Sequence, residues 1–397
     1  MMLLPLITGM LTAAVSLIAA PPGPAPAPKG SEPGQADFAA AADYSAKLAG
    51  HAVLVMRGGA VVFERYDNGW SADRPHMLAS GTKSFTGVLA MAAVQDGLFT
   101  LDEPVCDTIT EWKSDPLKRQ ITVRHLLTLS SGLSPQEGSL VPARRRGEGA
   151  AGGGRAARDT FSAAVAAPMT GTPGGQFAYG PTHYFAFGEF LERKLRASDR
   201  PQKTFLEYLA ARYFDAIGLS TGAFLLDGAG HPNLPGGCRL TARDWAKFGD
   251  LVLCEGAVRN KDGTRTQLIE PVLLAECFKP SARNRRYGLT WWLGAEGNPE
   301  ESLTPDRARR RRGGGQEEAA RTEGRSVGPD GKPVVMHMAA GLGKQRLYVL
   351  PQWDMVIVRF ADLSAEGRGF DDREFLRLAL GADRADGAAG RDAPKDR

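Results

Sequence analysis

The residue patterns that mark many metal and redox sites are missing from this chain of 397 residues. Its four cysteines contain no Cys-x-x-Cys pair, which disfavours a zinc ribbon or a dithiol site, and they are too few for a disulfide scaffold. The six histidines include no His-x-His or His-x-x-x-His pair, so a histidine-rich metal site is not expected. We therefore expect no metal, no cofactor, and four mostly buried thiols with at most one disulfide. The thiols are Cys106, Cys238, Cys254 and Cys277, and a Cys238–Cys254 pair stays open.

A general surplus of basic residues is also missing. Lysine and arginine number 49 against 45 acidic residues, which gives a net charge of +4. Eight of the basic residues stand in two arginine-rich runs, 144–146 and 307–312, and removing eight charges from +4 leaves −4 for the rest of the chain. A nucleic-acid-binding surface is therefore not indicated. The two runs are either solvated loops or contacts to an anionic surface such as lipid or polysaccharide.

The first residues of the chain differ from the rest in composition. Residues 3–20 form an apolar stretch that ends in the small residues Ala19 and Ala20. This pattern predicts a signal peptide over 1–20 and an exported protein, periplasmic or secreted. Because no lysine or arginine precedes Lys29, an uncleaved N-terminal membrane anchor is the alternative. Residues 21–37, rich in proline and alanine, predict a linker, residues 38–385 the folded domain, and residues 386–397 a disordered tail.

Hydrophobic periodicity predicts strands near both ends of the folded domain and helices between them. Expected strands are a hairpin over 52–66 around Gly58-Gly59, then 287–293, 334–339, 345–350 and 355–360. Expected helices are 80–95, 123–129, 185–195, 204–214, 245–253, 271–278 and 370–380. We predict an α+β fold whose antiparallel sheet is built from both chain ends, with flanking helices and a mainly helical lobe over about 97–240. The pattern-poor segments 134–176 and 301–331 are expected to be long insertions between elements.

The segment Ser80-Gly81-Thr82-Lys83 carries the clearest indication of chemistry. Residues three apart on a helix share one face, so the lysine amine can approach the serine hydroxyl. A serine hydroxyl needs a neighbouring base to attack a carbonyl, and a lysine can be that base if burial lowers its pKa. At the start of a helix, free backbone N–H groups also lie near Ser80. The structural alternative is an N-cap serine beside a surface lysine.

Several further segments follow in a characteristic order. They are SGTKSFTGVLAMAAVQDGLFTLDEPV, ITVRHLLTLSSGL, PGGQFAYGPTHYFAFG, LTARDWAKFGDLVLCEG, YGLTWWL and AAGLGKQRLYVLP. Together they make the chain resemble the serine β-lactamase and penicillin-binding-protein family, especially class C β-lactamases, over about residues 52–360. The last segment is most similar to the branch of 6-aminohexanoate-dimer hydrolases and carboxylesterases. The resemblance implies a β-lactamase/DD-peptidase-like fold.

The resemblance also assigns candidate catalytic residues. It implies that Ser80 is the nucleophile and Lys83 its proton-accepting partner. Tyr179 matches the tyrosine of the family's Tyr-x-Asn motif, whose phenol would relay a proton to the leaving group. The alternative for Tyr179 is a tyrosine of the core.

The third family motif aligns with Ala339-Ala340-Gly341, on the strand expected beside the serine. By the resemblance, Ala340 and Gly341 would contact substrate, with Gly341 allowing a close approach to backbone. The backbone N–H of Leu342 and that of Ser80 would form the oxyanion hole. A backbone donor does not depend on the side chain, so leucine at this position is compatible with the role.

Two positions depart from the family pattern. Pro181 stands in place of the asparagine of Tyr-x-Asn, and Ala339 in place of the cation of the third motif. These changes weaken the expectation of β-lactam or D-Ala-D-Ala recognition, because that cation and its neighbouring hydroxyl favour the substrate carboxylate. They leave the three acyl-transfer residues unaffected.

Aromatic and histidine residues also lie near these motifs. Tyr287, Trp291 and Trp292 are candidates for an aromatic pocket, and Trp291 is the predicted substrate contact. Because Trp291 and Trp292 are adjacent in a predicted strand, they should face opposite sides, so only one can line the site. His337 is expected to be structural.

The sequence thus favours an exported serine hydrolase that cleaves a small-molecule amide or ester through an acyl-enzyme on Ser80. A β-lactamase or D-Ala-D-Ala carboxypeptidase is one alternative. A non-catalytic binding protein on the same fold, motivated by Pro181 and Ala339, is another. No nucleic-acid partner is expected, and the sequence makes no prediction of oligomeric state.

Overall fold

A computed structural model describes residues 36–136, 159–294 and 335–381. The expected signal peptide, most of the linker, the tail and both arginine runs lie outside the described residues. Within the described ranges, every helix is too short or too polar to cross a membrane.

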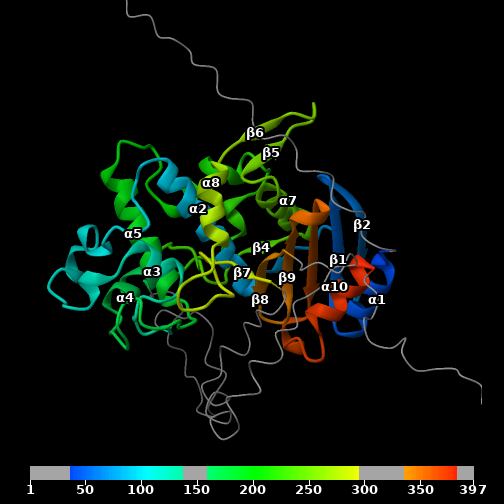
Figure 1. The fold of residues 1–397 in the computed structure, drawn as a ribbon, viewed down its shortest axis with the longest axis horizontal. Coiled ribbons are helices and arrows are strands. Elements are labelled where there is room, and N and C mark those ends of the chain that lie inside the picture. The colour runs from blue at the N-terminus through cyan, green and yellow to red at the C-terminus, as the bar shows by residue number, and fades with distance from the viewer. Residues whose placement is uncertain (1–35, 137–158, 295–334, 382–397) are drawn as a thin grey trace, which may run out of the picture.

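Antiparallel strands from both chain ends form the main sheet (Figure 1). In the described part of the chain it has six strands in the order β2-β1-β10-β9-β8-β7. Their bounds are β1 Gly50–Arg57, β2 Ala60–Tyr66, β7 Trp292–Leu293, β8 His337–Gly341, β9 Gln345–Leu350 and β10 Met355–Ala361. The first and last of the long strands pair in the centre, with Gly50 opposite Ala361 and Arg57 opposite Met355. This arrangement confirms the predicted α+β class.

Helices cover both faces of the sheet. The terminal helices α1 (Phe38–Lys47) and α10 (Asp372–Leu380) pack against each other, and α1 packs on β1. Helix α7 (Ala242–Leu253) packs on β1, β9 and β10, and Figure 1 shows it apart from the α1–α10 pair. The Thr241 hydroxyl caps α7 by accepting the Asp244 N–H at 3.1 Å.

The remaining helices form a lobe beside the sheet, on the left of Figure 1. They are α2 Lys83–Gln95, α3 Val123–Leu127, α4 Thr160–Ala166, α5 Thr182–Ala197, α6 Phe205–Leu209 and α8 Pro271–Leu274. Two short sheets, β3 His76–Met77 with β4 Arg239–Leu240, and β5 Ala257–Arg259 with β6 Arg265–Gln267, complete the described strands.

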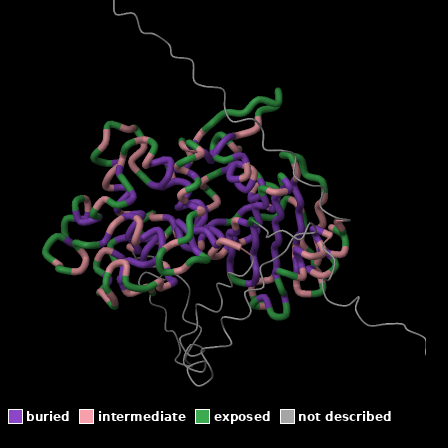
Figure 2. Tube along the Cα trace, in the orientation of Figure 1, coloured by how far each residue is buried: buried purple, intermediate pink, exposed green. Residues whose placement is uncertain are grey.

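Helix α2 is the central element of the core, buried from Lys83 to Ala93 (Figure 2). It is apolar around most of its circumference, which is typical of a helix enclosed by other elements. Gly87 permits one such contact, because a Cβ there would lie 2.4 Å from the Leu289 carbonyl oxygen. Ser80 and Lys83 therefore lie at the start of a helix that is enclosed by other parts of the fold.

The predicted strand over 287–293 is mostly wrong. Only Trp292–Leu293 is strand, and the preceding residues turn back so that Tyr287 bridges Trp292. Thr290, at φ 68°, makes this turn, and its Oγ1 accepts the N–H of Gly87 in α2 at 3.0 Å. A tertiary contact thus overrides the β propensity of the segment.

The four cysteines are buried and free, so the optional Cys238–Cys254 bridge is not formed. Burial raises the pKa of the Cys254 thiol to about 12, and a neighbouring Asp250 carboxylate adds to the effect. Burial likewise raises the pKa of Cys238 and Cys277, so these three thiols are unreactive packing residues.

Candidate active site

Ser80 lies in a one-turn 3₁₀ helix, η1 (Ala79–Thr82), directly before α2. Ala79 takes a positive φ of 47°, which is unusual for a residue with a side chain. The Thr82 hydroxyl holds this turn by donating to the Ala79 carbonyl at 2.8 Å and accepting the Cys238 N–H at 3.2 Å. Strained backbone held by its surroundings is common at functional sites.

Gly81 shows why the residue after the serine is small. A Cβ at this position would lie 2.7 Å from the Trp245 ring, which is closer than real Cβ atoms approach. The turn that presents Ser80 therefore rests directly on the Trp245 indole of α7, and the sheet-covering helix supports the site.

Lys83 meets Ser80 as the three-residue spacing predicts. Its Nζ lies 2.9 Å from Ser80 Oγ and 2.7 Å from the carbonyl oxygen of Pro235. The side chain is buried, and this burial lowers the pKa of Lys83 to about 7. A large fraction of the amine is therefore neutral near pH 7 and can accept the serine proton while donating to Pro235.

Two tyrosine rings complete the surroundings of the lysine amine. Lys83 Nζ lies 4.9 Å from the ring centre of Tyr179 and 5.4 Å from that of Tyr184. The Tyr184 hydroxyl hydrogen-bonds to the Tyr287 hydroxyl at 2.6 Å. Ring faces attract a cation, so they help to hold Lys83 in place after it takes up a proton.

Tyr179 is buried, but its hydroxyl completes no hydrogen bond with any described residue. Burial raises the pKa of Tyr179 to about 12, and the nearby Ser80 hydroxyl and Arg346 charge only partly offset the increase. The phenol therefore stays protonated at neutral pH. An unpartnered donor beside Ser80 is well placed to bond a group that enters the site.

Neighbouring residues hold the segment that carries Tyr179. His183, near the start of α5, donates from Nε2 to the Ala178 carbonyl at 2.8 Å and accepts at Nδ1 from the Ser131 hydroxyl at 2.9 Å. Burial lowers the pKa of His183 to about 4, which keeps it neutral in this role. Pro181 is the N-cap residue of α5, so it supplies no side-chain amide at the lysine.

The third motif lies where the alignment with the family expects it, at the end of β8 next to η1. A Cβ on Gly341 would lie 2.1 Å from the Leu78 carbonyl oxygen and 3.2 Å from the Ala79 Cβ, so only glycine allows this approach. Leu342 follows at the surface and is 45% exposed, while Ala340 is buried. The backbone of Gly341 thus lies against Leu78 and Ala79, the two residues directly before Ser80.

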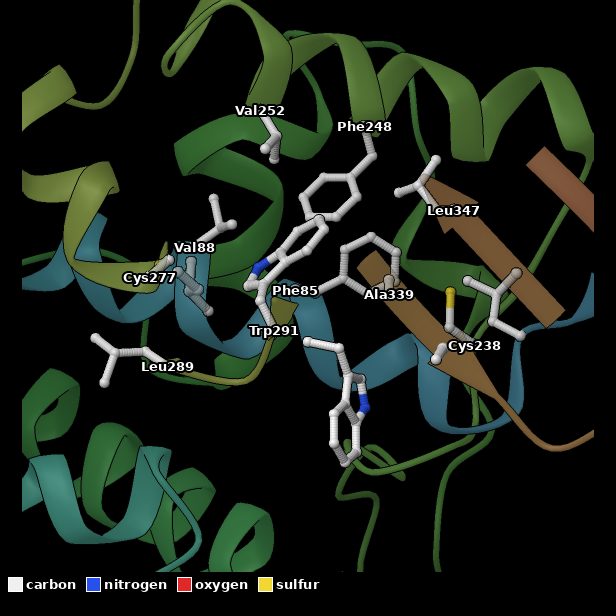
Figure 3. Close-up of a cluster of buried hydrophobic side chains, with 14 of the residues drawn as sticks. Phe85, Val88, Cys238, Phe248, Val252, Cys277, Leu289, Trp291, Ala339 and Leu347 are labelled. Carbon is white, nitrogen blue, oxygen red and sulfur yellow. The ribbon is translucent and has the colours of Figure 1, made fainter. Parts of the chain in front are cut away.

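The two adjacent tryptophans face opposite sides, as their spacing predicts, but Trp291 is not the one near the site. Trp291 is fully buried and stacks on Phe248 at 5.9 Å, inside the cluster that Figure 3 shows with Phe85 and Ala339. Trp292 instead lies 5.9 Å from the Tyr179 ring. Because the segment turns at Thr290 and does not continue as a strand, Trp292, and not Trp291, lies next to Tyr179. Trp292 therefore replaces Trp291 as the candidate substrate contact.

His337 is structural, in line with the expectation. Its ring stacks on Phe278 with centres 3.7 Å apart, and burial lowers the pKa of His337 to about 4. Among the described residues, no group of three or more His, Cys, Asp or Glu side chains is placed to hold a metal ion.

A second serine stands in a Gly-x-Ser-x-Gly pattern, Gly218 to Gly222, which sequence reasoning overlooked. This pattern can mark a strained nucleophile turn between a strand and a helix. Here Ser220 is exposed and caps a single 3₁₀ turn, where its hydroxyl accepts the Gly222 N–H at 3.2 Å. Ser220 therefore serves as a cap and gives a matched control for Ser80.

The comparison with known proteins agrees with this architecture. The family model for Beta-lactamase matches residues 36–381, and the chain belongs to that family. A 6-aminohexanoate-dimer hydrolase from Paenarthrobacter ureafaciens is 26% identical over 254 residues, which cover 61% of this chain and 63% of that protein. The match thus spans less than two thirds of that relative.

Solved structures share the fold at low sequence identity. A D-stereospecific amidohydrolase from a Streptomyces species aligns with a TM-score of 0.59 and 16% identity, covering 86% of this chain and 98% of that one. A class C beta lactamase from Rhodobacter sphaeroides aligns with a TM-score of 0.53 and 18% identity, covering 86% and 99%. These likenesses confirm the expected β-lactamase/DD-peptidase-like fold.

The structure adds two groups to the site that the sequence did not single out. The Pro235 carbonyl accepts from Lys83, and the Tyr184 ring faces the same amine. A backbone carbonyl from a distant loop has no sequence signature. Tyr184 could have been found from the sequence, because it lies on the first turns of α5, five residues after Tyr179.

Proposed function

We propose that the protein is a serine hydrolase that cleaves an amide or ester through an acyl-enzyme on Ser80. The observation that carries the proposal is the 2.9 Å contact between Ser80 Oγ and a buried Lys83 amine whose pKa lies at about 7. A hydroxyl paired with a base that is partly neutral at physiological pH is the arrangement that nucleophilic catalysis needs.

The chemistry follows from the positions of these groups. Ser80 Oγ bonds to the substrate carbonyl carbon while its proton passes to Lys83. The N–H groups of Ser80 and Leu342 stabilise the oxyanion. Tyr179 then gives its proton to the departing amine or alkoxide and regains one from the Lys83 ammonium. A water molecule repeats the attack on the acyl carbon, and the acid is released with Ser80 restored.

Small amides and esters without a required carboxylate are the substrates we propose. Ala339 supplies no cation to the third motif, and Figure 3 shows it within the hydrophobic cluster. The name of the 26% identical relative describes hydrolysis of a linear amide dimer, which supports amides as one substrate class. The β-lactamase alternative has no comparable support from the described residues.

Activated esters and a fluorophosphonate probe test the proposal. Wild-type protein should hydrolyse p-nitrophenyl acetate or butyrate and be labelled by the probe, whereas Ser80→Ala should lose both. Ser220→Ala is the matched control, because it removes an exposed serine of a Gly-x-Ser-x-Gly pattern, and it should behave like wild type. Equal labelling of the wild type and Ser80→Ala would remove Ser80 from the role. No turnover of any activated ester by the wild type would favour the binding-protein alternative.

A further inference from the structure

A buried arginine holds the hairpin between β8 and β9 from the β9 side. Arg346 is fully buried, and its Nη1 donates to the carbonyl oxygen of Gly341 at 3.2 Å and to that of Gln345 at 3.1 Å. The Gly341 carbonyl and the Leu342 N–H belong to the same peptide unit. The arginine therefore contacts the peptide that carries the proposed oxyanion donor.

Because the peptide unit is rigid, this contact also determines which way the Leu342 N–H points. The Gly341–Leu342 unit is trans, and in a trans peptide the C=O and N–H point in opposite directions. With the carbonyl turned to Arg346, the N–H points away from the guanidinium. Leu78, two residues before Ser80, packs against Gly341, as the 2.1 Å approach of its carbonyl oxygen to a Gly341 Cβ position shows.

The last helix anchors the arginine. Arg346 Nε and Nη2 donate to the two oxygens of Asp372, the first residue of α10, at 2.7 Å and 3.4 Å. The Tyr348 hydroxyl and Lys344 Nζ also donate to this carboxylate, at 2.6 Å and 3.3 Å. Burial alone would raise the pKa of Asp372, but these donors, with Arg346 first, hold it at about 2. The carboxylate therefore stays charged and keeps the guanidinium in one orientation.

A second side chain fixes the peptide on the other side of Leu342. Gln345 is fully buried, and its Nε2 donates to the Leu342 carbonyl at 3.1 Å. The same amide bonds to the backbone of Ala361 in β10 through both of its ends, at 2.7 Å and 2.9 Å. Both carbonyls flanking the Leu342 backbone are thus tied to the body of the sheet.

We propose that Arg346, anchored by Asp372, is a positioning residue that sets the direction of the Leu342 N–H in the oxyanion hole, with Gln345 as its partner. The inference rests on the proposed function of Ser80. The bond to the Gly341 carbonyl also polarises the peptide, which strengthens the Leu342 N–H as a donor to a developing negative charge. The side chain acts through the backbone and does not touch substrate.

Kinetics of Arg346→Lys provide the first test. Lysine keeps the positive charge for Asp372 but has one nitrogen in place of three, so it cannot hold both the carboxylate and the Gly341 carbonyl. The kcat for an activated ester should fall roughly 10- to 100-fold with KM changed by less than about threefold, because the contact matters only in the transition state. Tyr208→Phe is the control, since it removes a comparable tyrosine-to-aspartate hydrogen bond, to Asp96 at 2.6 Å, that involves neither Arg346 nor Gly341, and its kcat should stay within about twofold of wild type. Equal kcat values for the two variants would overturn the proposal.

A spectroscopic readout tests the geometry without turnover. The chain contains five Gly–Leu steps, so protein labelled with carbonyl-¹³C glycine and ¹⁵N leucine should give five selected amide signals, one from Leu342. Arg346→Lys should shift the Leu342 signal and speed its hydrogen exchange, while the Leu289 signal stays in place. An unchanged Leu342 signal would overturn the proposal. If Ser80→Ala keeps wild-type activity, the proposed function fails, yet this signal still decides whether Arg346 orients the peptide.

If Arg346→Lys does not fold, Gln345→Met tests the positioning of the Leu342 peptide in its place. It releases the Leu342 carbonyl and preserves the Arg346–Asp372 pair. The expected result is again a shifted Leu342 signal and a lower kcat at nearly constant KM. Wild-type values for both measurements would contradict the proposal.

Discussion

Lys83 shows how one buried side chain determines the chemistry of its neighbours. The amine has lost its water shell, and burial lowers its pKa to about 7. Its hydrogen-bond partners are the hydroxyl of Ser80 and the carbonyl of Pro235, and the neighbouring Tyr179 and His183 are both held neutral. The site therefore changes charge near pH 7 mainly through this one amine.

The pH dependence of the reaction should follow the protonation of Lys83. Because the neutral amine is the base, kcat/KM for an uncharged ester should rise with pH below about 7 and level off above it. Tyr179, with a pKa of about 12, adds no second step in the range where the protein is stable. Lys83→Arg, which stays protonated, should show several orders of magnitude less activity without this rise. A flat wild-type profile between pH 5.5 and 9 would contradict the assignment.

Tyr179→Phe should separate activity from stability. The variant removes a buried hydroxyl that completes no hydrogen bond with a described residue, so the thermal midpoint of unfolding should stay the same or rise. The loss of the proton donor should lower kcat by roughly 10²- to 10⁴-fold. Calorimetry and ester kinetics on the same sample measure both. A destabilised but active variant would show that Tyr179 is only a packing residue.

At the scale of elements, the sequence predicts correctly those helices and strands whose determinants lie within their own residues. The hairpin over 52–66 forms as β1 and β2, with Gly58 and Gly59 both at positive φ, because its turn chemistry is local. The segment 287–293 failed as a strand because Thr290 bonds α2, more than 200 residues earlier in the sequence. The same turn placed Trp292, and not Trp291, beside Tyr179.

Gly341→Ala should damage the site by separating two elements. The added methyl group would lie 2.1 Å from the Leu78 carbonyl oxygen, so β8 and η1 must move apart. We expect a lower thermal midpoint and a loss of ester hydrolysis of roughly 10²-fold or more, because the oxyanion donors are displaced. Gly171→Ala is the control, since its nearest contact would be an ordinary 3.7 Å. Wild-type activity in Gly341→Ala would contradict the close approach.

At the scale of the whole molecule, the predicted union of both chain ends in one sheet is confirmed, since β1 pairs with β10. Ser80 and Lys83 could be paired from spacing alone, because they stand three positions apart along a helical segment. Their contact with Pro235, and that of Arg346 with Asp372, could not be predicted. Each joins residues that local periodicity does not connect, and only the folded topology brings them together.

Arg359→Met should weaken the contacts that hold the two ends of the folded domain together. Arg359 is fully buried in β10 and donates to Ser45 in α1, to the Leu48 carbonyl after it, and to the Lys344 carbonyl. Removing these donors leaves buried carbonyls unpaired, at a cost of about 1–3 kcal/mol each in the free energy of unfolding. Urea denaturation should therefore show a loss of about 3 kcal/mol or more.

Arg65→Ala is the matched control for that experiment. Arg65 forms a partly exposed ion pair with Asp43 of α1, so its loss should cost less than about 1 kcal/mol. Equal losses of unfolding free energy in the two variants would show that the buried hydrogen bonds of Arg359 contribute no more than an exposed ion pair.

The central pairing of Gly50 with Ala361 also sets an order of events during synthesis. A ribosome adding about 5 to 20 residues per second needs roughly 15 to 60 s to travel between these two positions. Throughout that interval the backbone N–H and C=O groups along one edge of β1 lack the partner strand, which has not been made. The nascent protein therefore depends on whatever shields this edge until translation is nearly finished.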